Sequence, residues 1–301
     1  MDDVIVVSGL VKEYGSSRAV DDLSFRVSRG EVFALLGPNG AGKTTTVEIL
    51  EGHRERTSGE VRVLGFDPAI GGREYRERIG IVLQEAGFDE DFTVQELVRM
   101  YASLYPRRRD PDEVIEAVGL AEKAKSKTKT LSGGQRRRLD LALGVVGAPE
   151  LLFLDEPTTG FDPTARRRAW DLIASLRGHG TTILLTTHYM EEAQALADRV
   201  AVVASGRNVA EGTPSELIAN EMAGLIRFTL PDGIVLDELP LPGASAEGSM
   251  AVLQTVDPVR DLSVLTAWAL DRGVVLPDLT VVRPTLEDVY LRLTGAVGVD
   301  V

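Results

Sequence analysis

The chain has 301 residues, of which 44% are hydrophobic and 26% charged, a length and composition that favour about two globular domains and exclude global disorder. Its formal charge of -13 disfavours nucleic acid as a partner, because a chain this acidic repels a phosphate polymer. The chain has no cysteine, which excludes disulfides and thiol chemistry, and no apolar run long enough to cross a bilayer as a helix.

The N-terminal part predicts a strand that leads into a glycine-rich loop. Residues 2–30 indicate short strands with turns, and the apolar run Glu31–Leu36 predicts a buried strand. The eight residues from Gly37 to Thr44 fit the phosphate-binding pattern G-x-x-x-x-G-K-[ST] between a strand and a helix, as that pattern requires. The predicted nucleotide-binding residues of this segment are Gly37, Pro38, Asn39, Gly40, Ala41, Gly42, Lys43, Thr44 and Thr45.

Lys43 and Thr44 give the loop its predicted chemistry. Glycines let backbone N–H groups turn inward around phosphates, and the helix that begins near Lys43 adds a favourable partial charge. Lys43 is expected to reach the β- and γ-phosphates, and the Thr44 hydroxyl is expected to bind Mg²⁺. A glycine turn that only connects a strand to a helix is the alternative, which the Lys-Thr pair disfavours.

Further apolar runs predict more strands of the same sheet. Helix-like stretches separate them, and this alternation is typical of a largely parallel sheet flanked by helices. The runs are Ile79–Leu83, Leu151–Leu154, Thr182–Leu185 and Val200–Val203.

The pattern becomes helical after residue 84. Thr93–Glu96 has the Thr-x-x-Glu form of a helix capping box, which predicts a helical subdomain inserted at about residues 85–145. Three basic runs are interpreted as solvated helix faces. They are Arg107–Arg109, Arg136–Arg138 and Arg166–Arg168.

The segment Leu131–Gln135 reads LSGGQ and matches the signature of ABC (ATP-binding cassette) ATPases without a substitution, so the chain resembles that family. Ser132 and the two glycines would present a hydroxyl and bare N–H groups at a helix start, which is a second anion site. In this family two cassettes pair head to tail, and each ATP is held by the loop of one and the signature of the other. The resemblance therefore implies a second copy of the chain as partner, whose ATP is contacted by Ser132, Gly133, Gly134 and Gln135.

Two adjacent carboxylates, Asp155 and Glu156, end the apolar run that begins at Leu151. Asp155 fits the Mg²⁺-side carboxylate of P-loop ATPases, and Glu156 is placed to orient or deprotonate the attacking water. A solvated strand end is the alternative, and the loop at Gly37 favours the functional interpretation.

The family resemblance assigns roles to four further residues. Tyr14 matches the aromatic residue that stacks on adenine, and Gln84 the glutamine that senses Mg²⁺ and the attacking water. His188 matches the switch histidine that contacts the γ-phosphate, and Asp162 lies in the loop that follows the two carboxylates. The alternatives are that the tyrosine serves packing, that the glutamine is solvated, and that the histidine is a structural hydrogen-bond donor. Phe161 stands where the family usually has leucine, a change of volume that leaves the assignment intact and bears on the dimer contact.

A new series of strand-like and helix-like segments begins at about residue 220 and predicts a small α+β domain over residues 221–301. Its expected elements are Leu225–Leu230, Ala251–Val256, a helix near Leu262–Leu270, and Val274–Val282. Two segments, Thr46–Gly52 and Arg283–Tyr290, resemble drug-resistance and polyketide-antibiotic exporter ATPases, which normally pair with a separate ABC-2 type membrane permease.

The resemblance implies an α/β fold: a P-loop NTPase (ABC ATPase) core over residues 1–220, with an antiparallel β subdomain and the helical insertion. The predicted function is ATP hydrolysis, with ATP and Mg²⁺ bound, that powers export of a drug-like, antibiotic or lipid-like substrate through a permease. Because the N-terminus lacks a cationic signal-peptide region, the chain is expected at the cytoplasmic face of the membrane.

Two other functions remain open at this point. One is an ABC-type protein that acts on DNA or the ribosome, which the acidic balance and the short interval between Gln84 and Leu131 disfavour. The other is a module that binds ATP without hydrolysing it, which Glu156 and His188 disfavour.

Overall fold

The computed structural model describes residues 2–82, 87, 91–220, 224–231, 233–282 and 285–295. The chain divides into two compact units, one of Met1–Pro214 with Leu293–Val301 and one of Ser215–Arg292. Within the described ranges, no helix combines the length and the apolar character that a membrane span needs. Gln84, a predicted catalytic and Mg²⁺-binding residue, lies outside the described residues.

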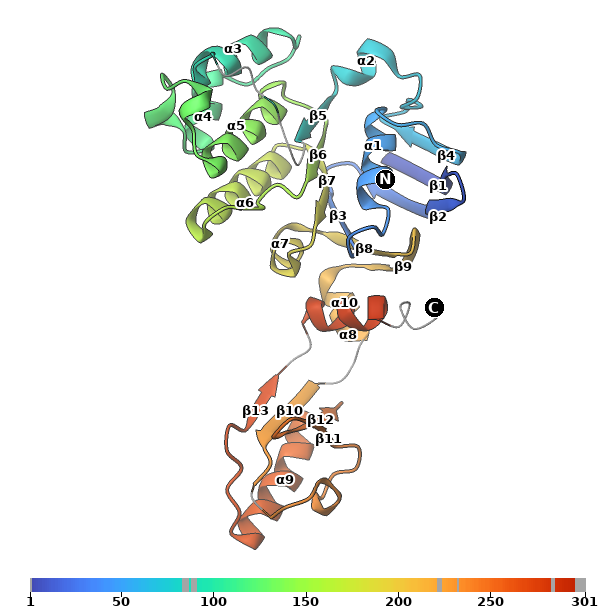
Figure 1. Cartoon of the computed structure of the whole chain (residues 1–301), viewed down its shortest axis with the longest axis vertical. Helices are drawn as coiled ribbons and strands as arrows, with labels where there is room; N and C mark the ends of the chain where they lie inside the picture. The colour runs from blue at the N-terminus through green and yellow to red at the C-terminus, as the bar shows by residue number, and fades with distance from the viewer. Residues whose placement is uncertain are drawn as a thin grey trace. The chain divides into compact units, whose positions relative to one another are not determined.

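A six-stranded sheet forms the middle of the first unit (Figure 1). Its strands in spatial order are β5 (Ile79–Val82), β6 (Leu151–Asp155), β7 (Thr182–Thr187), β3 (Val32–Leu36), β8 (Arg199–Ala204) and β9 (Arg207–Gly212). The first five run parallel and β9 is antiparallel to β8. Every residue of β3, β6 and β7 is buried, which explains why these strands are continuous apolar runs. The predicted parallel sheet is confirmed.

A three-stranded antiparallel sheet lies beside it, with β1 (Asp3–Tyr14) between β2 (Ser17–Ser28) and β4 (Ser58–Val63). The prediction of short strands over residues 2–30 was wrong, because β1 and β2 have 12 residues each. The pairing of β1 and β2 is irregular between Val7 and Leu10, where Gly9 has a φ of 60°. A bulge lets a strand continue through such a residue, so the glycine does not end the strand.

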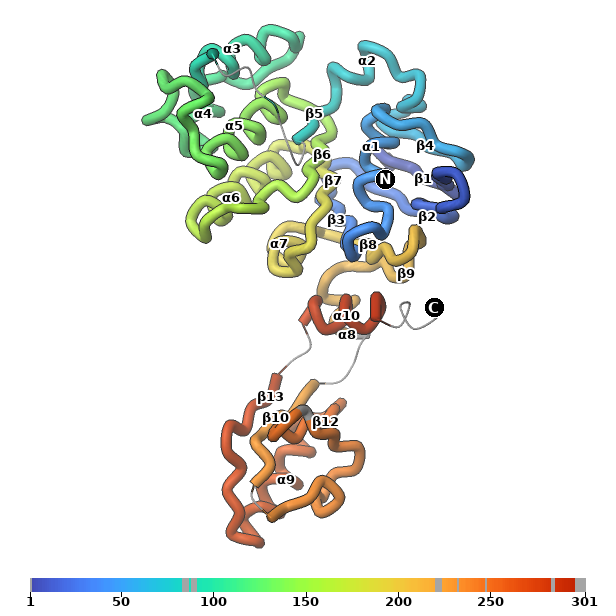
Figure 2. Tube along the Cα trace, viewed as in Figure 1, coloured from blue at the N-terminus to red at the C-terminus, as the bar shows by residue number. Residues whose placement is uncertain are grey.

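Helix α1 (Lys43–Glu51) packs between the two sheets (Figures 1 and 2). Ile49 and Leu50 are buried in a core that also contains Leu10 of β1 and Phe153 of β6. Because α1 packs against both sheets, the position of the loop that precedes it is fixed.

The helical insertion is built from α3 (Val94–Ser103), α4 (Pro111–Ala117) and α5 (Gly133–Val146), which gather on one side of the first unit (Figure 1). Thr93 and Glu96 form the predicted capping box of α3. Short 3-10 turns at Ala121–Lys123 and Thr128–Thr130 join α4 to α5. The other described helices that precede β10 (Gly224–Thr229) are α2 (Gly72–Arg76), α6 (Pro163–Gly178), α7 (Met190–Leu196) and α8 (Pro214–Asn220).

The second unit is a four-stranded antiparallel sheet with α9 (Pro258–Arg272) packed on one face. Ile226, Phe228 and Leu253 of the sheet form its core with Leu265 of the helix. The predicted strand Val274–Val282 was too long, because only Thr280–Val282 form a ladder with β10, and Pro277 and Asp278 before them form a turn. The strands in spatial order are β11 (Ser245–Glu247), β12 (Met250–Thr255), β10 (Gly224–Thr229) and β13 (Thr280–Val282), and α10 (Leu286–Gly295) follows.

Candidate functional site

The glycine-rich loop joins the end of β3 to the start of α1, and close backbone contacts fix its path. A Cβ atom on Gly37 would lie 2.3 Å from the carbonyl oxygen of Val203, and one on Gly42 would lie 2.3 Å from that of Ala19. Gly42 also has a φ of 96°, which side chains rarely tolerate. The two glycines are therefore required by the fold of the loop itself.

Lys43 is buried, and its ammonium group folds back over the loop. Its Nζ donates hydrogen bonds to the carbonyl oxygens of Gly37, at 2.7 Å, and Pro38, at 3.1 Å. Burial lowers the pKa of the Lys43 ammonium, and the carboxylates of Glu156 and Asp155 partly offset this effect. A positive charge with so little water around it would bind a phosphate strongly.

A pocket of about 400 Å³ lies over this loop. It brings six of the nine predicted loop residues together with Glu156, which is far away in sequence and follows β6. The side chains and backbone that line it come from Ala19, Asn39, Gly40, Gly42, Lys43, Thr44, Thr45 and Glu156.

The two carboxylates at the end of β6 have different surroundings. Asp155 is buried, and its Oδ1 accepts a hydrogen bond from the hydroxyl of Thr186 on β7. Burial raises the pKa of the Asp155 carboxyl, and the Thr186 hydrogen bond acts against this rise. Thr44 and Asp155 together offer a hydroxyl and a carboxylate, the hard oxygen donors that Mg²⁺ takes up beside substrate phosphates.

Glu156 occupies a left-handed backbone conformation with a φ of 48°. Its Oε1 lies 3.1 Å from Nδ1 of His188, and its Oε2 accepts a hydrogen bond of 3.3 Å from Thr159. His188 directly follows β7, so parallel neighbouring strands deliver both side chains to one edge of the sheet. The structure thus brings Glu156 and His188, two of the three predicted catalytic residues, into contact.

The signature residues begin α5. Ser132 is its N-cap and forms a capping box with Gln135: Ser132 N donates to Gln135 Oε1 at 2.9 Å, and Gln135 N donates to Ser132 Oγ at 3.3 Å. A Cβ atom on Gly133 or Gly134 would meet no atom within 4 Å. Packing within the chain therefore gives no reason for glycine at these two positions. Among the described residues, none of the four lines the Lys43 pocket.

Tyr14 and Asp162 also lie apart from the described lining of that pocket. Tyr14 is 42% exposed, with Lys12 Nζ 5.1 Å and the Arg54 guanidinium 5.4 Å from its ring centre. Asp162 caps α6, because its Oδ1 accepts hydrogen bonds of 2.9 Å from the backbone N–H groups of Thr164 and Ala165. The Tyr14 ring is partly exposed to solvent and has two cations near it, and the Asp162 carboxylate caps the start of α6.

Comparisons with known proteins agree with this geometry. The family model "ABC transporter" matches residues 20–159, and a model described as "ABC transporter domain-containing protein-like, C-terminal domain" matches residues 224–285. The daunorubicin resistance ATP-binding protein DrrA3 of Streptomyces coeruleorubidus is 40% identical, over 98% of this chain and 96% of that protein. The chain belongs to the ABC transporter family.

Two more relatives of this ABC protein extend the comparison. The Nod factor export ATP-binding protein I of Rhizobium johnstonii is 41% identical over 97% of this chain and 94% of that protein. A solved ATP-binding subunit of an ABC transporter superposes with a TM-score of 0.67 at 27% identity, over 72% of this chain and 93% of that chain. The predicted α/β fold of an ABC ATPase is confirmed.

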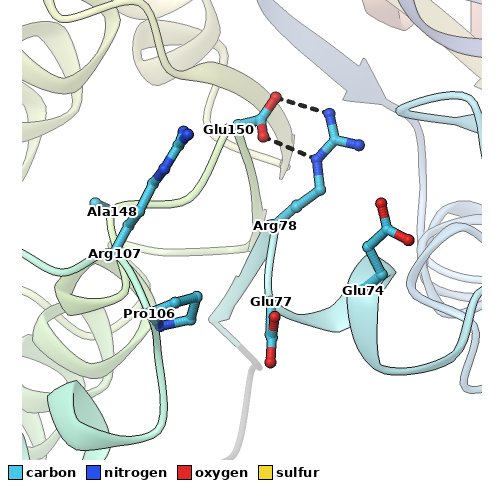
Figure 3. Close-up of a pocket in the computed structure, with 7 residues that line it drawn as sticks. All are labelled: Glu74, Glu77, Arg78, Pro106, Arg107, Ala148 and Glu150. Carbon is cyan, nitrogen blue, oxygen red and sulfur yellow. Dashed lines mark hydrogen bonds and ion pairs between the residues drawn. The ribbon is translucent and has the colours of Figure 1, made fainter.

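A second pocket of this ABC protein, of about 320 Å³, lies where β5 and β6 begin (Figure 3). Arg78 and Glu150, which directly precede these strands, form two hydrogen bonds of 2.8 and 2.9 Å. Pro106 and Arg107, from the connection between α3 and α4, form another part of the wall. Gly37 and Glu156 follow the ends of parallel strands, so this pocket lies at the opposite edge of the sheet from the phosphate loop. The residues that line it come from both the sheet and the helical insertion.

Sequence reasoning missed three side chains around the carboxylates. The prediction of a solvated face for Arg136–Arg138 was wrong for Arg137, which is buried and bonds to the backbone after β6. Thr186 on β7 bonds to Asp155. Glu192 on α7 is buried and accepts hydrogen bonds from Thr158, at 2.7 Å, and from Trp170, at 3.1 Å. The spacing of Arg137 and Asp140 on one apolar helix face was the available signal for the first of these.

Proposed function

We propose that this ABC protein is the ATP-hydrolysing subunit of an exporter and drives a separate ABC-2 type membrane permease from the cytoplasmic face of the membrane. The observation that carries this proposal is that Lys43 and Glu156 line one pocket. A phosphate loop by itself binds a nucleotide, whereas a carboxylate beside it supplies a base for hydrolysis. The names of the relatives, daunorubicin resistance and Nod factor export, support export of a drug-like, antibiotic or lipid-like substrate.

ATP would bind with its phosphates on the backbone N–H groups of the loop and the start of α1. Lys43 would exchange its two carbonyl partners for β- and γ-phosphate oxygens, which are stronger acceptors for an ammonium group. Thr44 and Asp155 would hold Mg²⁺, and Gln84 is assigned to the same ion. When bound, Mg²⁺ neutralises negative charge on the β- and γ-phosphates.

In the hydrolysis step, Glu156 accepts a proton from the attacking water. The water oxygen bonds to the γ-phosphorus while the bond from that phosphorus to the β–γ bridging oxygen breaks, which yields ADP and inorganic phosphate. The proton then leaves Glu156 for solvent. The contact with His188 Nδ1 keeps one carboxylate oxygen of Glu156 in a fixed direction, and we assign His188 to the γ-phosphate as well.

A second copy of the chain would complete the site. The four signature residues form a helix start with open space beside both glycines, and they do not line the described Lys43 pocket of their own chain. We therefore assign Ser132, Gly133, Gly134 and Gln135 to the ATP that the partner's loop holds. Asp162 lies at the start of α6, and we assign it to the nucleotide site that the two paired chains form.

Tyr14 is expected to stack on the adenine ring. Tyr14→Ala should weaken ATP binding by about 10- to 100-fold, because stacking of a base on an aromatic side chain contributes roughly 1–3 kcal/mol. Tyr14→Phe should bind ATP like the wild type, since it keeps the ring. Titration with a non-hydrolysable ATP analogue measures both. Unchanged affinity in Tyr14→Ala would remove Tyr14 from the nucleotide site.

The exporter function is tested by isolating the tagged chain from its native host. We expect Mg²⁺-dependent ATPase activity and a multispanning membrane protein that is recovered with the chain and raises that activity. Recovery with ribosomes or DNA, and no membrane protein, would contradict the export role. An absence of ATPase activity with the membrane protein present would contradict the enzymatic role.

A further inference from the structure

Arg137 is a buried cation on α5, the signature helix, which begins after Ser132. Its side chain bonds to the catalytic turn, which consists of residues 155–157 at the end of β6 and contains Glu156. Its Nη2 donates hydrogen bonds to the carbonyl oxygens of Asp155 and, at 2.9 Å, of Glu156, and its Nε donates to that of Pro157 at 3.3 Å. Three consecutive carbonyl groups of one turn therefore point at a single guanidinium. A guanidinium has five N–H donors in a planar fork, so few other side chains could serve three acceptors in this way.

The backbone of this turn needs such support. Glu156 lies in the left-handed region, with a φ of 48°, which residues other than glycine seldom occupy. A conformation of this kind persists where the surroundings hold it in place. The described bonds of Arg137 to the carbonyls of residues 155–157 bracket the strained residue on both sides.

Arg137 is itself held in a buried setting. Its Nη1 lies 3.8 Å from Oδ2 of Asp140, one turn further along α5, and both residues are buried. The other side of the turn is fixed independently, because Thr158 donates a hydrogen bond to the buried Glu192. The loss of Arg137 would therefore free the part of the turn around Glu156 without releasing the whole loop.

We infer that Arg137 is a positioning residue for catalysis: from the signature helix, it holds the backbone of the turn that aims the Glu156 carboxylate. Arg137 is not among the described residues that line the Lys43 pocket. This inference rests on the proposed ATPase function, because it concerns the base of that reaction. One helix, α5, then has two roles. Ser132 at its start faces the partner, and Arg137, five residues later, bonds to the catalytic turn of its own chain.

Arg137→Lys tests the inference in the full-length chain, because it keeps the positive charge and removes the fork. We expect kcat for ATP to fall by about 10- to 100-fold, since a misplaced catalytic group commonly costs this much, and the Kd for an ATP analogue to stay within about twofold. Arg99→Lys is the matched control, because the Arg99 guanidinium of α3 donates instead to Oδ2 of Asp112 on α4, at 3.0 Å, within the helical insertion. It should keep kcat within about twofold.

A purely structural role would have a different outcome. In a Glu156→Gln background, Arg137→Lys should still form the ATP-dependent dimer, because Ser132 and its capping box remain. If the dimer weakens as much as kcat, Arg137 supports the signature helix and the inference is wrong. If Arg137→Lys keeps wild-type kcat, the inference is also wrong, while the proposed function stands as long as the wild type hydrolyses ATP.

Asp140→Asn covers the case in which Arg137→Lys does not fold. It keeps the guanidinium but removes the carboxylate oxygen that lies 3.8 Å from it, and it should lower kcat in the same direction, by a smaller factor, at unchanged ATP affinity. Wild-type kcat in folded Asp140→Asn together with an unfolded Arg137→Lys would show that Arg137 serves stability, and would overturn the inference.

Discussion

Glu156→Gln is expected to stop ATP turnover while ATP binding persists. A positioned general base contributes about 10²- to 10⁴-fold to a rate, and the amide of glutamine cannot accept the proton of the attacking water at neutral pH. The shape of the side chain is kept, so the pocket that Lys43 and Glu156 line should still admit ATP. Without hydrolysis, the ATP-bound dimer should accumulate and become visible by size-exclusion chromatography with light scattering.

Glu191→Gln is the matched control for this substitution. Glu191 is an exposed carboxylate on α7, three residues after His188, and the same chemical change there should leave turnover unaltered. Rapid hydrolysis by Glu156→Gln would mean that another group is the base, and it would remove Glu156 from the catalytic role.

Gly134→Asp is expected to abolish ATP-driven dimerisation and to lower ATPase activity by about 100-fold or more, which is the order expected when a site loses a group that binds transition-state charge. The space beside Gly134 is open, and an acidic residue in the first turn of a helix is favourable, so the monomer should fold normally. The new carboxylate would instead face the phosphates of the partner's ATP and repel them. Analytical ultracentrifugation with and without ATP measures the first effect.

Val259→Asp controls for the added charge, because Val259 is an exposed second residue of α9, the same helical position that Gly134 has in α5. It should dimerise like the wild type. A Gly134→Asp variant that dimerises normally with ATP would contradict the assignment of the signature residues to the partner's ATP. A variant that unfolds would also contradict it, because the glycine would then be required by packing within the chain.

Much of the fold was predictable because the decisive signals are local. The phosphate loop and the carboxylate pair each sit at the end of a buried apolar strand, and both faces of such strands are covered, which leaves continuous runs in the sequence. The capping box of α3 is likewise encoded within four residues. These features depend little on the rest of the chain.

The errors arise where long-range packing decides. Whether β1 continues past Gly9 depends on its pairing with β2, and whether Val274 joins a strand depends on β10. Apart from its spacing from Asp140, Arg137 resembles its basic neighbours in the sequence, and the packing of α5 against the end of β6 turns it inward. The contact of Glu156 with His188 could be expected only from the family resemblance, because 31 residues and one helix separate them.

A nucleotide site shared between two chains can be tested directly by mixing two inactive variants. Lys43→Ala should lose ATP binding to its own loop, and Gly134→Asp should lose its signature, so each should be inactive by itself. In a sandwich dimer the mixed pair regains one intact site. Because neither variant should pair with itself when ATP is added, the dimers that form are mixed, and an equal mixture should recover up to about half of the wild-type ATPase rate, since each mixed dimer has one good site of two. If the mixture stays inactive although mixed dimers form with ATP, the shared site is contradicted.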